Sequence, residues 1–225
     1  MRPPLSLGVL VSGEGSTLDG LAAALAAETD RVRIALVVCD RAGAPALERA
    51  RRRGLATSLR PYSPTDIDGW SAGLTADLDS RHVDLVVLAG FLSILPPGWV
   101  DRWTGRAINL HPSLLPRFGG RGMHGRRVHE AVLAAGDRET GVTVHLVTGD
   151  VDGGPPVAHE RIPVLPGDTP ESLRDRLRPV EVRLLASTVR RFADGDLPLP
   201  YPGGDERARE ERPAPARRAD TPRSG

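Results

Sequence analysis

The sequence predicts an α/β fold, a Rossmann-like open and mostly parallel sheet with helices on both faces. Two observations support this class. Short apolar segments alternate with segments of helical periodicity through most of the chain, which is typical of a parallel sheet built from strand–helix–strand units. The apolar segments are also almost uninterrupted, as in LVVLA at residues 85–89, which fits strands buried on both faces.

The first element is an apolar strand at residues 5–11, which ends in a glycine-rich turn at residues 12–17. A helix over residues 18–27 follows, because its apolar residues recur at helical spacing. Pro45 fits the start of another helix, since proline is favoured at the first helical position. The repeated pattern predicts, in order, a strand at 32–38, a helix at 46–53, a strand at 56–59, a helix at 70–80 and a strand at 83–89.

A further strand is expected over residues 106–111. It follows a polar segment that contains Trp99 and Trp103, which we expect to be packing residues. Pro112 stops this strand, because proline has no N–H group for a ladder hydrogen bond.

The second half ends in a long helix over residues 171–192. Thr169 is a good N-cap for it and Pro170 a good first residue. Pro179 should kink or divide this helix, because it removes one backbone hydrogen bond. Before it, the pattern predicts a helix at 128–135 and strands at 141–147 and 157–162.

We expect one catalytic domain over residues 1–197 and a disordered tail over residues 198–225, where proline, arginine and acidic residues replace apolar ones. The net charge of +1 gives no electrostatic basis for binding nucleic acid or a membrane. Cys39 is the only cysteine, which fits a reducing compartment. No apolar run approaches the roughly 20 residues of a membrane span. These features favour a cytoplasmic monomer or homodimer that binds small molecules and no metal.

Asn109 is the only asparagine in a chain that also lacks lysine and glutamine. Asn109 and His111 are two residues apart on one strand, so both point to one face, at the end where open parallel sheets bind ligands. A neutral carboxamide offers N–H donors that stabilise a developing oxyanion. Asp152, in the loop after strand 141–147, is placed to reach His111 and raise its pKa. An ordinary turn asparagine and ordinary Asp-Gly-Gly turn chemistry are the alternatives.

The turn that contains Gly15, Ser16 and Thr17 joins the first strand to the first helix, so its N–H groups and the helix dipole can hold a phosphate. It lacks the third glycine of a dinucleotide-binding turn and the lysine of a nucleoside-triphosphate loop, so one phosphomonoester is the better match. A plain tight turn is the alternative.

Two further features lie near the same expected edge of the sheet. The apolar loop at residues 91–95 offers a surface for a flat heterocycle, unless it only seals the sheet edge. His145 is either a wall of the site or a core histidine. His124 and His129 are weaker candidates for a substrate mouth.

The most specific motif is NLHPSLLP at residues 109–116, followed by GVTVH at 141–145 and DGGP at 152–155. On these motifs the chain, from about Leu5 to Leu197, resembles the phosphoribosylglycinamide formyltransferases of the formyltransferase superfamily. Residues 118–132 are similar to one branch with a longer glycine-rich insertion. The family moves a formyl group from 10-formyltetrahydrofolate to the amine of glycinamide ribonucleotide in purine biosynthesis.

The resemblance implies direct attack of the amine on the formyl carbon, with Asn109 and protonated His111 stabilising the oxyanion and Asp152 supporting His111. It implies no metal and no covalent enzyme intermediate. Two sets of binding residues are also implied: Gly15, Ser16, Thr17 and Glu181 for the nucleotide substrate, and Leu92, Ser93, Ile94, Leu95, Thr148, Gly149, Asp150 and Val151 for the folate.

Several positions depart from the family pattern, and they bear on the substrate more than on the chemistry. A formyltransferase that acts on a different amine in a specialised pathway is therefore an alternative, and a non-catalytic folate or nucleotide-binding protein is another. Methionyl-tRNA formyltransferase and formyltetrahydrofolate hydrolase would each be expected to carry an additional domain. The departures are an added charge at Glu14, Thr17 for asparagine, Cys39-Asp40 for Ser-Asn, Ser93 for one branch's arginine, and Val182 for histidine.

Overall fold

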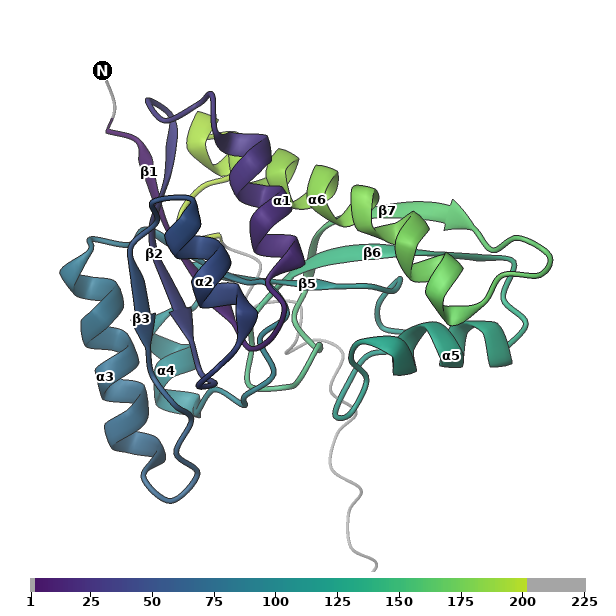
Figure 1. Cartoon of the computed structure of the whole chain (residues 1–225), viewed down its shortest axis with the longest axis horizontal. Coiled ribbons are helices and arrows are strands. Elements are labelled where there is room, and N and C mark those ends of the chain that lie inside the picture. The colour runs from purple at the N-terminus through teal and green to yellow at the C-terminus, as the bar shows by residue number, and fades with distance from the viewer. Residues whose placement is uncertain (1–2, 202–225) are drawn as a thin grey trace, which may run out of the picture.

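A seven-stranded sheet forms the middle of the molecule, and helices cover both of its faces (Figure 1). The structure is a computed structural model that describes residues 3–201. The strand order is β3-β2-β1-β4-β5-β6-β7, in which β1 to β5 are parallel and β6 is antiparallel to both neighbours. The strands are β1 Leu5–Val11, β2 Val32–Cys39, β3 Thr57–Leu59, β4 Leu85–Leu88, β5 Ala107–His111, β6 Glu139–Leu146 and β7 Pro156–Pro163. The predicted fold class is confirmed.

Each face of the sheet has its own apolar core, because successive residues of a strand point to opposite faces. Val9 and Val11 of β1 belong to the core under α1, α2, α5 and α6, whereas Leu10 belongs to the core under α3 and α4. Trp99 and Trp103 are buried in the second core, as predicted. The helices are α1 Ser16–Leu25, α2 Pro45–Arg52, α3 Ile67–Ser80, α4 Pro97–Arg102, α5 Arg126–Ala134 and α6 Pro170–Asp194.

Helices α1 and α6 lie side by side on one face of the sheet (Figure 1). They approach closely at Gly20, where an added Cβ would come within 2.3 Å of Val182 Cγ2. Gly15, the N-cap of α1, has φ 75° and lies so close to α2 that a Cβ would be 2.7 Å from Ala46 Cβ. Glycine therefore serves both the backbone conformation and the packing of this turn.

Helix α6 is not divided at Pro179, so of the two effects expected of this proline, division is wrong and a kink stays a prediction. It runs unbroken over 25 residues from Pro170. Thr169 caps it as predicted, accepting from the Ser172 N–H group in a capping box. Buried Leu177 and Val180 lie on either side of the proline, so tertiary packing holds both halves of the helix in place.

The described chain stays attached to the domain beyond residue 197. Tyr201, which the sequence analysis assigns to the tail, donates its backbone N–H to the Gly105 carbonyl at 2.8 Å and contacts Phe192 edge to face. Residues 202–225, the rest of the expected tail, lie outside the described residues. The domain boundary therefore stays a prediction.

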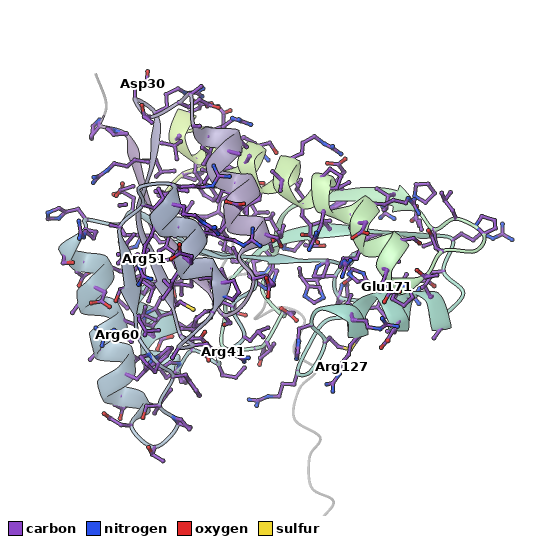
Figure 2. The ribbon with its side chains drawn as sticks, viewed as in Figure 1. Asp30, Arg41, Arg51, Arg60, Arg127 and Glu171 are labelled. Carbon is purple, nitrogen blue, oxygen red and sulfur yellow. The ribbon has the colours of Figure 1, made fainter. Side chains whose placement is uncertain are left out.

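Charged side chains such as those of Arg51, Arg127 and Glu171 project from the helices and are exposed (Figure 2). Within residues 3–201, no helix is both long and apolar enough to cross a membrane. In the same part of the chain, histidine, cysteine and acidic side chains nowhere gather in a group of three that could hold a metal ion.

Candidate active site

A cavity of about 520 Å³ opens where β1, β4 and β5 end. Its size is within the usual range for small-molecule sites. The predicted site residues come from elements far apart in the sequence, yet all of them except Gly15 line this one cavity. Gly15 directly precedes two of them as the N-cap of α1. His124 and His129, the weaker candidates, line the cavity too, as do Arg174 and Arg178.

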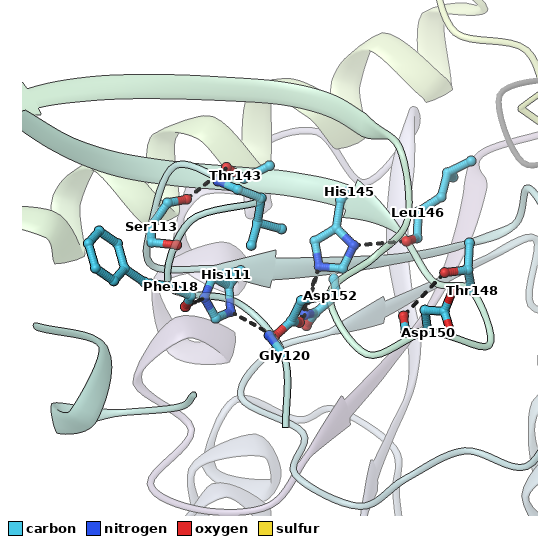
Figure 3. Close-up of polar contacts among 12 residues, drawn as sticks. His111, Ser113, Phe118, Gly120, Thr143, His145, Leu146, Thr148, Asp150 and Asp152 are labelled. Atoms are coloured by element: carbon cyan, nitrogen blue, oxygen red, sulfur yellow. Dashed lines mark hydrogen bonds and ion pairs between the residues drawn. The ribbon is translucent and has the colours of Figure 1, made fainter. Parts of the chain in front are cut away.

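Asn109, His145 and Asp152 form one hydrogen-bonded group that lines the cavity. Figure 3 shows His145 and Asp152 beside each other in this group. β5 and β6 pair in antiparallel register with Asn109 opposite His145. The Asn109 Nδ2 atom is 3.0 Å from His145 Nε2 and donates to Asp152 Oδ1 at 3.3 Å. His145 Nδ1 is 2.8 Å from the Leu146 carbonyl. A carbonyl only accepts, so Nδ1 carries the proton and Nε2 accepts from Asn109. His145 is thus a site wall that orients the amide.

His111 lies between two acceptors. Its Nε2 atom is 2.8 Å from the Phe118 carbonyl and therefore carries a proton, while Nδ1 is 3.5 Å from Asp152 Oδ2. The second distance is longer than a normal hydrogen bond. Nδ1 is consequently the nitrogen at which His111 can take up a proton, beside a carboxylate that would stabilise the resulting charge.

Burial decides the protonation of this pair. The His111 side chain is only 5% exposed, and its burial lowers its pKa below the usual 6.5 despite the raising effect of Asp152. Asp152 thus raises the pKa of His111, as expected, but it does not keep the imidazolium populated near neutral pH, because desolvation of the imidazolium outweighs the charge pair. For Asp152, burial acts to raise the pKa, but nearby His111 and the hydrogen bond from the Gly120 N–H group hold it below its usual range. At neutral pH the carboxylate is ionised and His111 is neutral.

Asp152 owes its position to an unusual backbone conformation. It has φ 56° in the loop between β6 and β7, a left-handed conformation that aspartate tolerates better than most residues. Its Oδ2 atom accepts from the Gly120 N–H group at 3.0 Å. The carboxylate therefore joins this loop to the glycine-rich segment that follows His111.

The residues that fix the chain just after His111 were not predicted from the sequence. Thr143 Oγ1 donates to the Ser113 carbonyl at 2.7 Å and accepts from the Leu115 N–H at 3.2 Å. Thr143 lies two residues before His145 on β6, so the two share a face of the strand. That spacing was the available signal.

The loop at residues 91–95 alternates between anchored and free side chains. Phe91 and Leu95 pack against the second core, and Ser93 hydrogen-bonds Asp40. Leu92 and Ile94, in contrast, are 39% and 42% exposed at the cavity. These two are the exposed apolar residues among the predicted folate residues of this loop.

The opposite side of the cavity is polar. Ser16 and Thr17 begin α1, and no side chain of residues 3–201 caps the N-terminus of this helix. Helix α6 contributes Glu181 and Arg178. Burial raises the Glu181 pKa to about 7, against a smaller lowering effect of Arg178. Free N–H groups and a guanidinium at this side suit an anionic ligand.

Most departures from the family pattern lie outside the cavity lining. Glu14 is 72% exposed and lies 3.9 Å from Arg49, a weak surface pair. Cys39 is buried, and burial raises its pKa. Val182 packs against α1 at Gly20. Thr17 and Ser93 are the departures that line the cavity.

Comparison with known proteins agrees with this architecture. The formyl transferase family model matches residues 6–189. Phosphoribosylglycinamide formyltransferase of Escherichia coli is 36% identical over 87% of this chain and 90% of its own length. The enzyme of that name from Mycobacterium tuberculosis is 40% identical over 84% of this chain and 86% of its own. A crystal structure of the Coxiella burnetii enzyme in complex with CHES superposes with a TM-score of 0.79, at 36% identity, over 86% of this chain and 89% of that chain.

Proposed function

The chain belongs to the formyl transferase family, and we propose that it transfers a formyl group from 10-formyltetrahydrofolate to the amine of glycinamide ribonucleotide. The observation that carries this proposal is the convergence of Asn109, His111 and Asp152 at the floor of one cavity. An amide donor, a neutral imidazole and a carboxylate are suited to acyl transfer to an amine, which needs oxyanion stabilisation and a proton acceptor.

The cavity has complementary ends for the two substrates. Leu92 and Ile94 give an apolar surface for the folate ring system, and the loop at residues 148–151 adds backbone donors and acceptors. Formyltetrahydrofolate is the co-substrate of the family and supplies the formyl group. The N-terminus of α1 at Ser16 and Thr17 is suited to the ribonucleotide phosphate, and Glu181 to its neutral or cationic groups.

The amine nitrogen bonds to the formyl carbon, the bond from that carbon to the tetrahydrofolate nitrogen breaks, and the tetrahydrofolate nitrogen leaves with a proton. In this proposal His111 accepts the proton that the amine loses. Its Nε2–H group stays on the Phe118 carbonyl, so Nδ1 takes the proton. Asp152, 3.5 Å away, then stabilises the imidazolium. Burial favours neutral His111 in the free protein, which is the form that can act as a base. Once protonated, the same group helps to stabilise negative charge nearby.

Asn109 supplies the donor for the oxygen that becomes negative. In the free protein its Nδ2 group contacts His145 and Asp152. We propose that the bond to Asp152, the longer at 3.3 Å, is exchanged for one to the substrate. His145 keeps its contact with Asn109 and so acts as a positioning residue.

Glycinamide ribonucleotide is favoured over a different amine acceptor because most departures from the family pattern lie outside the cavity lining. Glu14, Cys39 and Val182 do not line the cavity. Thr17 does, but a phosphate at this turn is held through backbone N–H groups, which threonine retains. Action on small molecules, as a monomer or homodimer in the cytoplasm, remains our expectation.

A formyl-transfer assay tests this proposal. Turnover of 10-formyltetrahydrofolate is measured with and without glycinamide ribonucleotide, for the wild type, His111→Ala and His159→Ala. His159 is an exposed histidine on β7 and serves as the matched control. We expect nucleotide-dependent turnover that only His111→Ala abolishes. Folate binding without such turnover would point to another amine, and absence of folate binding would refute the assignment.

A further inference from the structure

Two departures from the family pattern are in direct contact. The Ser93 hydroxyl, in the loop at residues 91–95, donates a hydrogen bond to Asp40 Oδ2 at the carboxyl end of β2. The two residues are 53 positions apart in the chain. Asp40 stands where the family commonly has asparagine, and Ser93 stands where one branch has arginine. The two departures therefore form one interaction, a hydrogen bond from a hydroxyl to a carboxylate.

This contact is one of several that fix the loop. Ser12, which follows β1, donates its N–H to the Gly90 carbonyl at 3.2 Å and accepts from the Leu92 N–H at 2.8 Å through its hydroxyl. The Phe91 ring is stacked on Trp70 at a centroid distance of 6.5 Å. Between these points, Ser93 lines the cavity and bonds to Asp40, which does not line it.

The bond of Ser93 to Asp40 fixes the loop between Leu92 and Ile94. These two neighbours are 39% and 42% exposed and line the cavity. Large apolar side chains exposed at a cavity are a surface for a ligand.

Asp40 is held in a costly environment. It is 3% exposed, and its Oδ1 atom has no hydrogen-bond partner among the described residues. A buried oxygen without a partner destabilises the fold. A carboxylate oxygen is, however, a stronger acceptor for a hydroxyl than an amide oxygen. The arrangement lowers the stability of the fold, but it holds the loop through a strong hydrogen bond.

We propose that Asp40 is a positioning residue for the folate end of the cavity, acting through Ser93 to keep Leu92 and Ile94 turned toward the ligand. The inference rests on the proposed function and deepens it. Asp40 itself touches neither substrate, since it does not line the cavity.

Calorimetric titration with 10-formyltetrahydrofolate in the absence of the amine tests this role. The variants are Ser93→Ala, Asp40→Ala, their combination, and Asp40→Asn, which keeps an acceptor oxygen. Ser58→Ala is the matched control, because Ser58 donates to Asp77 at 2.8 Å in the same kind of bond away from the cavity. Steady-state assays then separate the KM for folate from kcat and from the KM for the ribonucleotide.

We expect Ser93→Ala and Asp40→Ala each to weaken folate binding about tenfold, the cost of a hydrogen bond to a charged group. The combined variant should be no weaker than either single one, because both remove one interaction. Asp40→Asn should retain most of the affinity, and Ser58→Ala all of it. The KM for folate should rise while kcat and the KM for the ribonucleotide change little.

Multiplicative losses in the combined variant, or equal losses in Ser93→Ala and Ser58→Ala, would overturn the inference. Wild type that binds folate without formylating the ribonucleotide would refute the proposed acceptor, yet the binding series would still decide the role of Asp40. Wild type that binds no folate would overturn both.

Discussion

At the scale of single residues, the site is governed by competition between burial and charge. His111 and Asp152 lie 3.5 Å apart with side chains 5% and 9% exposed. Burial disfavours both charged forms, but Asp152 has hydrogen-bond donors around it, whereas His111 faces only acceptors that cannot offset its desolvation fully. The pair therefore rests as a carboxylate and a neutral imidazole, ready to accept one proton.

This predicts how activity depends on pH. If His111 is the base, kcat/KM should fall as the pH drops through the His111 pKa, which lies below 6.5. In Asp152→Asn the remaining activity, lower by roughly 10²-fold, should fall at a still lower pH, because the charge that raises the His111 pKa is gone. A pH–rate profile from pH 5 to 8 measures both limbs. An acid limb that moves upward in Asp152→Asn would contradict this assignment.

The raised pKa of Glu181 predicts that the free energy of unfolding falls as the pH rises. Its pKa is about 7 in the folded protein against 4.5 ordinarily, so the folded state keeps a proton that the unfolded state loses. The folded state is therefore favoured below about pH 4.5, and this contribution is lost as the pH rises to about 7. Glu181→Gln should raise the free energy of unfolding relative to wild type at pH 8 by roughly 2 kcal/mol, and much less at pH 5.

Denaturant unfolding of both proteins at several pH values measures this difference. Comparison with Glu181→Gln isolates the residue from His111 and His129, whose lowered pKa values act in the other direction over pH 5 to 6.5. A difference that does not grow between pH 5 and 8 would show that Glu181 titrates normally.

At the scale of elements, the contact of α1 with α6 sets the distance across the polar end of the cavity. Ser16 and Thr17 begin α1, and Glu181 precedes the Val182 side chain that packs at Gly20. The histidine-to-valine departure is thus a helix-packing feature. The same two helices position the groups proposed for the ribonucleotide.

Gly20→Ala should lower the free energy of unfolding by roughly 1–2 kcal/mol, because its Cβ would come within 2.3 Å of Val182 Cγ2. In a Val182→Ala background the clashing methyl groups are absent, and the same change should be neutral or stabilising through helix propensity. Thermal unfolding of the four proteins in this cycle measures the coupling. Equal effects in both backgrounds would exclude the packing explanation.

At the scale of the whole molecule, the end of the described chain packs back onto the domain through Tyr201. This residue and Leu199 pack on the first core, and the Tyr201 backbone bonds to the Gly105 carbonyl before β5. We propose that residues 1–201 form the functional domain, four residues more than the sequence indicates, and that the remaining tail has no catalytic role.

Truncation after Tyr201 should leave turnover and the melting temperature unchanged. Truncation after Leu197 removes the contacts of Leu199 and Tyr201, and should lower the free energy of unfolding by roughly 2–4 kcal/mol. The two truncated proteins are compared by thermal unfolding and formyl-transfer assay. A large fall in turnover for the 1–201 protein would give the tail a role.

The sequence by itself determined the strands, their alternation with helices and the shared face of Asn109 and His111. These features follow from local periodicity, since adjacent side chains on a strand point to opposite faces whatever surrounds them. The turn at Gly15 and the cap at Thr169 were likewise predictable, because they depend on residues within one turn of each other.

Only the tertiary structure decided the direction of the His111 pKa, the packing role of Val182, the unbroken helix at Pro179 and the bond of Ser93 to Asp40. Each depends on groups that are far apart in the chain, and burial and charge pairing are properties of the folded neighbourhood. Local propensity sets which elements form, but the sum of contacts around a residue sets its protonation, its partners and the strain it tolerates.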